Sequence, residues 1–232
     1  MKKAFSLLGT ILLLAFIGCK EKEPEVVQKD DAETPPLFSL LDSESTNIRF
    51  QNNLKESLNA NVLVYEYLYN GAGVAVGDFN DDGLIDIYFT SNMGDNKFYI
   101  NKGDMKFEDI TNIAKVSGRP GPWKTGITAA DVNGDGKLDL YLCYSGALPP
   151  QKRQNQLFIN QGVDANNNPV FEEKAAAYGL DSPAFSNQGY FLDYDHDGDL
   201  DMLLLNHNPK SLPVLNEVST AEYLKKDDQM QG

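Results

Sequence analysis

Three acidic segments of nine residues constrain this chain more than any other feature of its sequence. The segments are Asp78–Asp86, Asp131–Asp139 and Asp193–Asp201, called here loop 1, loop 2 and loop 3. Each has Asp at relative positions 1, 5 and 9, Asp or Asn at position 3, and Gly at position 6. Carboxylates this close repel one another unless a cation lies among them, and calcium accepts six to eight oxygen ligands in flexible geometry. Glycine supplies the positive φ of a tight turn. The spacing therefore predicts a turn wrapped around a calcium ion.

The predicted ligands are the side chains at positions 1, 3, 5 and 9 and the backbone carbonyl at position 7. In loop 1 they are Asp78, Asn80, Asp82, Leu84 and Asp86; in loop 2 Asp131, Asn133, Asp135, Lys137 and Asp139; in loop 3 Asp193, Asp195, Asp197, Asp199 and Asp201. A single acidic turn is more often only a solvated loop. Three copies with the same spacing favour calcium, and predict about three bound ions. Loop 3 has four ligand carboxylates against three in each of the others, so it is expected to bind most tightly.

The residues around the loops distinguish them from EF-hands. An EF-hand requires Glu at position 12 and flanking helices, whereas position 12 here is Phe89, Leu142 or Leu204. Apolar, β-rich runs precede and follow each loop, and they are typical of buried strands. The repeated unit is therefore predicted to be strand, calcium loop, strand.

The pattern D-x-[DN]-x-D-G-x-x-D between two strands resembles the FG-GAP/VCBS repeat of integrin-α-like β-propellers. The internal similarity continues beyond the loops: Lys97–Gly103 parallels Gln156–Gly162, and 107–109 parallels 171–173. The arrangement is similar to bacterial lipoproteins of the cartilage acidic protein, or ASPIC/UnbV, family. The resemblance covers about residues 62–208. The third copy departs from it, because Gln188 replaces the glycine present at Gly73 and Gly126 and no second N-x-G strand follows.

This resemblance implies an all-β fold, a partial β-propeller of about two and a half blades of four-stranded antiparallel sheet with calcium loops between strands. The capping box Ser219–Glu222 adds a short C-terminal helix. Propellers close with ~4–8 blades, so the chain is interpreted as the N-terminal portion of a longer protein. Asn47–Phe50 is expected to be a short strand before the repeats, and Val62–Tyr69 a strand that enters the first repeat.

The N-terminus predicts export and lipidation. Lys2 and Lys3 precede the apolar run Ala4–Ile17, which is too short to span a bilayer. The sequence Phe16-Ile17-Gly18-Cys19 resembles a bacterial lipobox, in which Cys19 is lipidated. The alternative is an ordinary signal peptide with an incidental cysteine. The expected organisation is a lipoprotein signal peptide (1–18), a flexible tether (19–36), a lead-in segment (37–61), propeller repeats (62–216) and a helical tail (217–232).

The charge of the chain excludes one class of function. The formal net charge is −14. Loss of Lys2 and Lys3 with the signal peptide changes it to −16, and three calcium ions would bring it to −10. Nucleic-acid binding is not expected, because phosphate contacts require Lys and Arg patches. Cys143 lies in an apolar run and is expected to be a buried free thiol.

No catalytic constellation accompanies the loops. The chain has two histidines, His196 and His207, and lacks H-E-x-x-H and G-x-S-x-G motifs. The sequence therefore favours a binding or adhesion module over an enzyme. Its expected partner is a protein or glycan, and its expected place is the bacterial outer membrane or cell surface. One alternative stays open, an accessory or catalytic part of a glycan-active enzyme. A catalytic calcium with an open coordination position is disfavoured, because each loop offers five protein oxygens.

Overall fold

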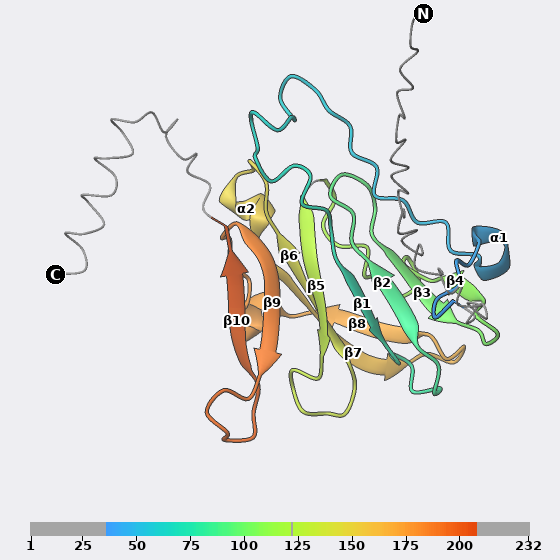
Figure 1. Cartoon of the computed structure of the whole chain (residues 1–232). Helices are drawn as coiled ribbons and strands as arrows, with labels where there is room; N and C mark the ends of the chain where they lie inside the picture. Colours follow the sequence, from blue (N-terminus) through green and yellow to red (C-terminus); the bar gives the residue numbers. More distant parts are fainter. Residues whose placement is uncertain (1–35, 122, 208–232) are drawn as a thin grey trace, which may run out of the picture. The chain divides into compact units, whose positions relative to one another are not determined.

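The computed structural model describes residues 36–121 and 123–207. Within them, ten strands form three antiparallel sheets, all in the compact unit that begins at Leu41 (Figure 1). The first sheet has the order β1-β2-β3-β4 (Val74–Gly77, Asp86–Phe89, Lys97–Asn101, Phe107–Asp109). The second has the order β5-β6-β7-β8 (Lys124–Ala130, Asp139–Tyr144, Gln156–Val163, Pro169–Glu173). The third pairs β9 (Ser186–Leu192) with β10 (Asp201–Asn206). The expected all-β, partial propeller with two complete blades and part of a third is confirmed.

Three single-turn helices accompany the sheets: α1 (Ser43–Thr46), α2 (Pro150–Arg153) and α3 (Ala175–Tyr178). None of the helices in 36–121 and 123–207 is long and apolar enough to cross a bilayer. The predicted signal peptide, Cys19 and the C-terminal helix lie outside the described residues.

The two complete sheets share one register. Asn101 faces Phe107 where β3 pairs with β4, and Asn160 faces Phe171 where β7 pairs with β8. The equivalence read from the sequence between these segments is thus an equivalence of strand position. Each repeat builds one antiparallel blade.

The hydrophobic core lies between successive blades. One cluster joins the first two blades through residues such as Tyr88, Phe98, Leu140 and Phe158. A second cluster lies between the second blade and the β9–β10 pair, and includes Cys143, which is a buried free thiol as expected. Strand β6 is buried along its whole length because it contributes side chains to both clusters.

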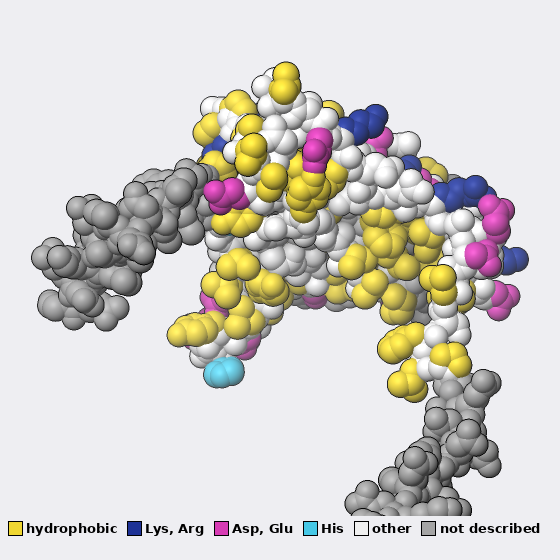
Figure 2. Space-filling view, turned by 45° about the horizontal axis from the view of Figure 1, so that its top comes forward, with side chains coloured by type: hydrophobic (Ala, Val, Ile, Leu, Met, Phe, Trp, Pro, Cys, Tyr) yellow, Lys and Arg dark blue, Asp and Glu magenta, His cyan; other side chains and the backbone are white. Residues whose placement is uncertain are grey.

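The β9–β10 hairpin has one covered and one open face. Phe191, Met202 and Leu204 contact the second blade. The alternate residues point away and are exposed: Tyr190, Leu192, Leu203 and Leu205. Figure 2 shows hydrophobic side chains exposed on the lobe that this hairpin forms. This half-blade therefore stabilises the second blade while its own outer surface stays accessible.

The innermost strands β1, β5 and β9 lie side by side, and they approach closely at glycines (Figure 1). A Cβ atom on Gly126 would lie 1.8 Å from Oε1 of Gln188 and 2.4 Å from the carbonyl oxygen of Asn187. Gln188, the residue that departs from the repeat pattern, uses this space: its Nε2 donates to the Ile127 carbonyl (3.1 Å) and to Thr128 Oγ1 (2.6 Å). The third repeat thus keeps its place beside β5 with a side chain in place of a glycine.

Gly126→Ala is therefore expected to destabilise the fold by about 2–3 kcal/mol, because over-packing a close contact forces backbone to move. Urea denaturation followed by circular dichroism measures the loss. The double variant Gly126→Ala/Gln188→Ala removes the contact with the side chain but not that with the Asn187 backbone, so it should recover only part of the stability. Full recovery would show that the backbones are not in contact.

The segment Val62–Tyr69 forms consecutive turns, so the strand expected there is wrong. The side chain of Asn61 accepts hydrogen bonds from the amides of Leu63 (3.0 Å) and Val64 (3.2 Å). These bonds stabilise a turn in place of a strand. Leu68 is then buried and Tyr65 contacts Trp123 edge-on. Leu68 and Tyr65 therefore anchor a connection, while Val62, Leu63, Val64 and Tyr69 are exposed, so the segment does not form the face of a strand.

The strand expected over Asn47–Phe50 is also absent, since these residues have no regular structure. They lie against the outer face of the first blade: Phe50 stacks on Phe89 with ring centroids 4.7 Å apart, and the amide of Arg49 donates to Tyr99 Oη. Aromatic stacking and two hydrogen bonds hold the segment, the second from Asn47 Nδ2 to the Phe107 carbonyl (3.1 Å), so no strand pairing is needed.

Candidate metal centre

The three acidic loops connect β1 to β2, β5 to β6 and β9 to β10, and all lie at the same end of the blades (Figure 1). The glycine at position 6 has positive φ in each: 84° at Gly83, 85° at Gly136 and 96° at Gly198. Position 4 is also left-handed, with φ of 57° at Asp81 and 62° at His196. The predicted turn at position 6 is confirmed, and the backbone of each loop is left-handed at two positions, 4 and 6.

The carboxylate at position 1 organises each curl. In loop 2, Asp131 accepts from the amides of Asp135 (3.0 Å) and Gly136 (2.8 Å). Asp78 accepts from the equivalent amides in loop 1, and Asp193 from Gly198 in loop 3. The amide at position 7 donates to the position 5 carboxylate in all three loops. Backbone donors therefore hold the position 1 and position 5 carboxylates over the same turn.

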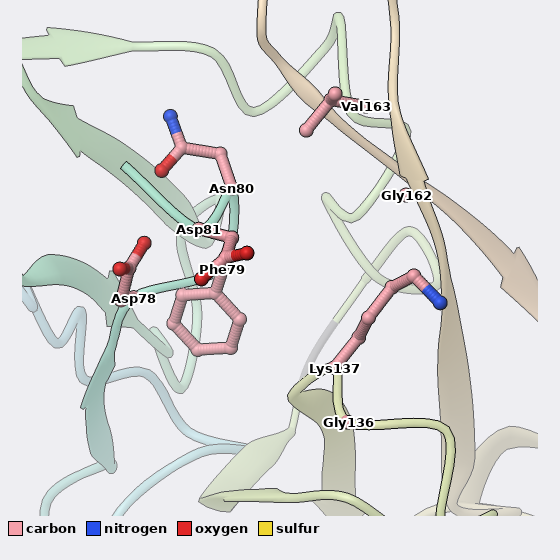
Figure 3. Close-up of a pocket in the computed structure, with 8 residues that line it drawn as sticks. All are labelled: Asp78, Phe79, Asn80, Asp81, Gly136, Lys137, Gly162 and Val163. Carbon is pink, nitrogen blue, oxygen red and sulfur yellow. The ribbon is translucent and has the colours of Figure 1, made fainter. Parts of the chain in front are cut away.

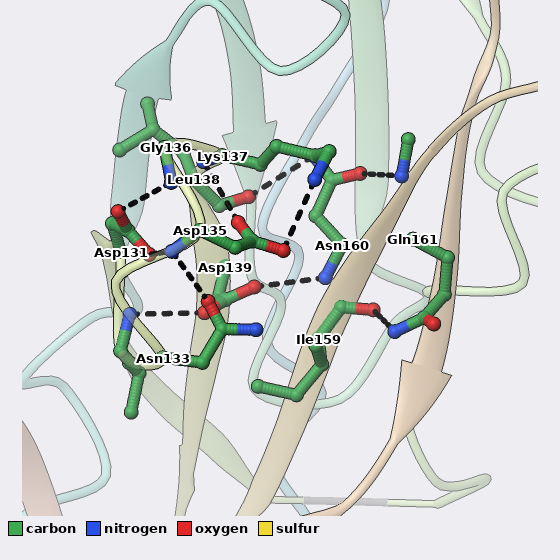
Figure 4. A network of polar contacts seen from close by, with 12 residues as sticks. Asp131, Asn133, Asp135, Gly136, Lys137, Leu138, Asp139, Ile159, Asn160 and Gln161 are labelled. Atoms are coloured by element: carbon green, nitrogen blue, oxygen red, sulfur yellow. Dashed lines mark hydrogen bonds and ion pairs between the residues drawn. The ribbon is translucent and has the colours of Figure 1, made fainter.

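The carboxylate at position 9 ties the loop to its blade. Asp139 is buried, and it accepts from the amide of Val132 (2.9 Å) and from that of Asn160 on β7 (2.8 Å) (Figure 4). Asp86 is buried in the same way and accepts from Phe79 and Asn101. Burial raises the pKa of Asp139, and raises that of Asp86 to about 6.

Asp201 differs from its two counterparts. It is exposed, and accepts only from the amide of Tyr194 (3.0 Å), because no third strand lies beside β10 within the described residues. The Asp201 carboxylate therefore accepts one backbone hydrogen bond, whereas those of Asp86 and Asp139 accept two each.

Asn101 and Asn160 hold loops 1 and 2 in place, and in the sequence they are distinguished only as part of the N-x-G repeat. The side-chain amide of Asn160 donates to the carbonyls of Leu138 (3.2 Å) and Phe79 (2.9 Å), and its Oδ1 accepts from Gly162 (2.9 Å). It thus fastens loop 2 to its own blade and reaches loop 1 of the preceding blade. The N-x-G sequence that follows each of the first two loops is the feature from which these two asparagines could have been identified.

Loop 3 contains three carboxylates that converge on one point. One carboxylate oxygen from each of Asp193, Asp195 and Asp197 lies within 4.8 Å of the others. Among the described residues, no other set of three His, Cys, Asp or Glu side chains converges in this way. The pKa of Asp199 is raised by its hydrogen bond to the Asp197 carboxyl and by the surrounding negative charges. A cation at this point would relieve the repulsion.

Two side-chain oxygens in the loops are buried without a hydrogen-bond partner: Oδ1 of Asn80 and Oδ1 of Asp193. They occupy position 3 of loop 1 and position 1 of loop 3, both predicted ligand positions. Figure 3 shows the amide oxygen of Asn80 turned toward the Asp78 carboxylate. Buried polar atoms are normally satisfied, so these oxygens fit a hard cation that prefers oxygen ligands.

A cleft of 300 Å³ separates loop 1 from loop 2 and β7 (Figure 3). Asp78, Asn80 and Asp81 line one side, and Lys137 and Val163 the other. His196, at position 4 of loop 3, is exposed.

Comparisons with known proteins agree with this architecture. Residues 78–142 match the family model described as an FG-GAP-like repeat, which runs here from loop 1 to β6. Residues 78–142 are therefore similar to an FG-GAP-like repeat, and in the structure they belong to the first two blades of the partial propeller. Such repeats are typical of extracellular binding or adhesion modules.

Among particular proteins, the chain is similar to cartilage acidic protein 1. It is 30% identical to the human protein over 148 residues and 29% identical to the mouse protein over 148 residues. Each alignment covers 62% of this chain and 22% of the relative. The Xenopus tropicalis protein is 29% identical over 157 residues, covering 65% of this chain and 22% of the relative. The chain thus spans about a fifth of the length of the curated relatives it matches.

Proposed function

We propose that this chain is a calcium-binding, membrane-tethered extracytoplasmic binding or adhesion module whose three loops hold structural calcium. The observation that carries the proposal is the convergence of Asp193, Asp195 and Asp197 in a loop whose turn geometry recurs in loops 1 and 2. The FG-GAP-like repeat supports a binding role. When bound, calcium would supply positive charge that fixes each loop between its two strands.

Each loop would hold its ion with the residues predicted from the spacing. The side chains at positions 1, 3 and 5 lie over one turn, and position 9 joins the turn to the second strand of the blade. A filled loop would hold the end of the innermost strand rigidly. The ligand of the module, a protein or a glycan, would then meet a surface of fixed shape.

Equilibrium dialysis of the purified chain against calcium tests the metal part of the proposal, with about three ions bound per chain as the expected result. Asp131→Ala should remove one ion, because it removes the position 1 ligand of loop 2. Asp164→Ala is the control: Asp164 also accepts backbone amides in an Asn-rich turn, at 2.8 and 3.0 Å, but its segment has Asn168 at position 5 and, at position 6, Pro169, which cannot adopt the positive φ of the loop glycines. A stoichiometry of zero, or equal effects of the two variants, would contradict the proposal.

The binding part is tested on a glycan array and with a panel of extracellular matrix proteins, each probed in calcium and in EDTA. Calcium-dependent retention of a defined ligand is the expected result. Hydrolysis or cleavage of an arrayed glycan would instead favour an enzyme.

The tether is tested by Cys19→Ala. Because Cys19 is the proposed site of lipidation, the variant should leave the membrane fraction and appear in the soluble extracytoplasmic fraction. Immunoblots of fractionated cells measure the distribution, with Cys143→Ala as the control for loss of a cysteine. Retention of the Cys19→Ala variant in the membrane would mean that the anchor lies elsewhere.

A further inference from the structure

The three loops differ at position 7, where the sequence has Leu84, Lys137 and Asp199. Lys137 is the one lysine or arginine among the 27 positions of loops 78–86, 131–139 and 193–201. The backbone carbonyl of position 7 is a predicted calcium ligand, so the side chain of this residue starts beside the site. The charge of the position 7 side chain therefore affects how strongly the loop binds the ion.

Lys137 folds back onto its own loop. Its amide donates to Oδ1 of Asp135 at 2.9 Å, and its Nζ lies 3.1 Å from Oδ2 of the same carboxylate (Figure 4). Both oxygens of the position 5 ligand are thus engaged by one residue. The two side chains are only partly exposed, at 42% and 34%.

The other loops have no such cation. In loop 1, Oδ2 of Asp82 accepts from the neutral side-chain amide of Asn80 at 2.9 Å. In loop 3, Asp197 accepts from the amide of Asp199 at 3.1 Å, and its carboxylate converges with two others. The position 5 carboxylate therefore meets a positive charge in loop 2, a neutral donor in loop 1 and further carboxylates in loop 3.

We propose that Lys137 is a tethered counter-ion that competes with calcium for loop 2, so that loop 2 fills last and empties first. This inference rests on the proposed calcium function. An ammonium group and a calcium ion at one carboxylate are both positive and repel each other, so they cannot both bind it closely. Calcium must therefore displace the Lys137 ammonium.

The cleft beside loop 2 has room for the Lys137 side chain after calcium displaces its ammonium from Asp135. Lys137 lines the cleft between loop 2 and loop 1, and its side chain extends along that cleft (Figure 3). The ammonium can move there without moving the backbone of the loop. Loop 2 thus responds to calcium at concentrations at which loops 1 and 3 are already filled.

Nuclear magnetic resonance of the full chain tests this loop by loop. The position 6 amides of Gly83, Gly136 and Gly198 each donate to the position 1 carboxylate of their own loop, so each reports on one site. In a calcium titration of the wild type, Gly136 should have the highest midpoint. Lys137→Met should lower the Gly136 midpoint about two- to fivefold, the range expected for a partly exposed ion pair, and leave those of Gly83 and Gly198 unchanged.

Two further variants complete the design. Lys174→Met removes a cation paired with Glu172 in the same blade, and should not move the Gly136 midpoint. Leu84→Lys places a lysine at position 7 of loop 1 and should raise the Gly83 midpoint by a similar factor. An unchanged Gly136 midpoint in Lys137→Met, or an equal shift in Lys174→Met, would overturn the role of Lys137 while leaving calcium binding intact. If no glycine amide responds to calcium in any variant, the calcium function itself is wrong and the inference with it.

Discussion

Removal of calcium with EDTA is expected to lower the melting temperature of this protein by about 15 °C or more. An ion that binds the folded loop and not the unfolded chain stabilises by about 2.7 kcal/mol at a hundredfold excess over its Kd, so three sites give about 8 kcal/mol. Each kcal/mol corresponds to roughly 2–4 °C for a domain of this size. Chelation also restores the repulsion among Asp193, Asp195 and Asp197, whose oxygens lie within 4.8 Å of one another.

Differential scanning calorimetry in calcium and in EDTA measures the shift, with Asp164→Ala as a control whose melting temperature should fall between calcium and EDTA by the same amount as that of the wild type. Two loop 3 variants refine the test. In calcium, Asp201→Ala should lose more stability than Asp195→Asn, because the first removes the ligand that joins the loop to β10. The second keeps an oxygen at position 3 and recreates the pattern of Asn80 and Asn133. An unchanged wild-type melting temperature in EDTA would show that none of the three loops is a calcium site.

The repeated unit could be predicted from the sequence because each of its parts has a local signature. The glycine at position 6 indicates positive φ, as found at Gly83, Gly136 and Gly198. The apolar runs beside each loop indicate buried strands, and β6 is buried throughout. Since the loop and its two strands are consecutive, no long-range information was required.

The features that were not predicted depend on contacts between distant segments or on weak local preferences. Position 4 of the loops is left-handed, but Asp81, Gly134 and His196 share no side-chain chemistry that indicates it. Val62–Tyr69 has the composition of a strand, yet the Asn61 side chain caps a turn there. The bond between Asn160 and the carbonyl of Phe79 joins residues 81 positions apart, so only the packing of one blade on the next reveals it.

The same reasoning applies to the candidate site. The spacing of the loops predicted all fifteen ligand positions alike, but the structure gives the position 9 carboxylates two environments. Asp86 and Asp139 are buried and accept backbone amides from a third strand, while Asp201 is exposed and has no such strand among the described residues. The number of strands in a blade, and not the loop sequence, decides this difference.

That difference leads to the second large effect, which is independent of calcium. Asp139→Ala is expected to destabilise the protein by about 3 kcal/mol or more in EDTA, because it leaves the buried amide of Asn160 and the amide of Val132 without an acceptor. Asp201→Ala removes one bond, to the amide of Tyr194, at an exposed position, and should cost about 1 kcal/mol under the same conditions.

Urea denaturation of both variants in EDTA measures the two free energies of unfolding. Asp139→Asn provides the matched control for shape: its amide oxygen can still accept one backbone N–H, but its NH₂ group meets the second donor, so its loss should fall between zero and that of Asp139→Ala. Burial of a charged Asp139 is itself unfavourable, as its raised pKa indicates, so the amide variant also relieves a desolvation cost. Equal losses for Asp139→Ala and Asp201→Ala would mean that the third strand contributes nothing to holding the loop. A larger loss for Asp139→Ala would establish that position 9 fastens loop 2 to its blade before any ion binds.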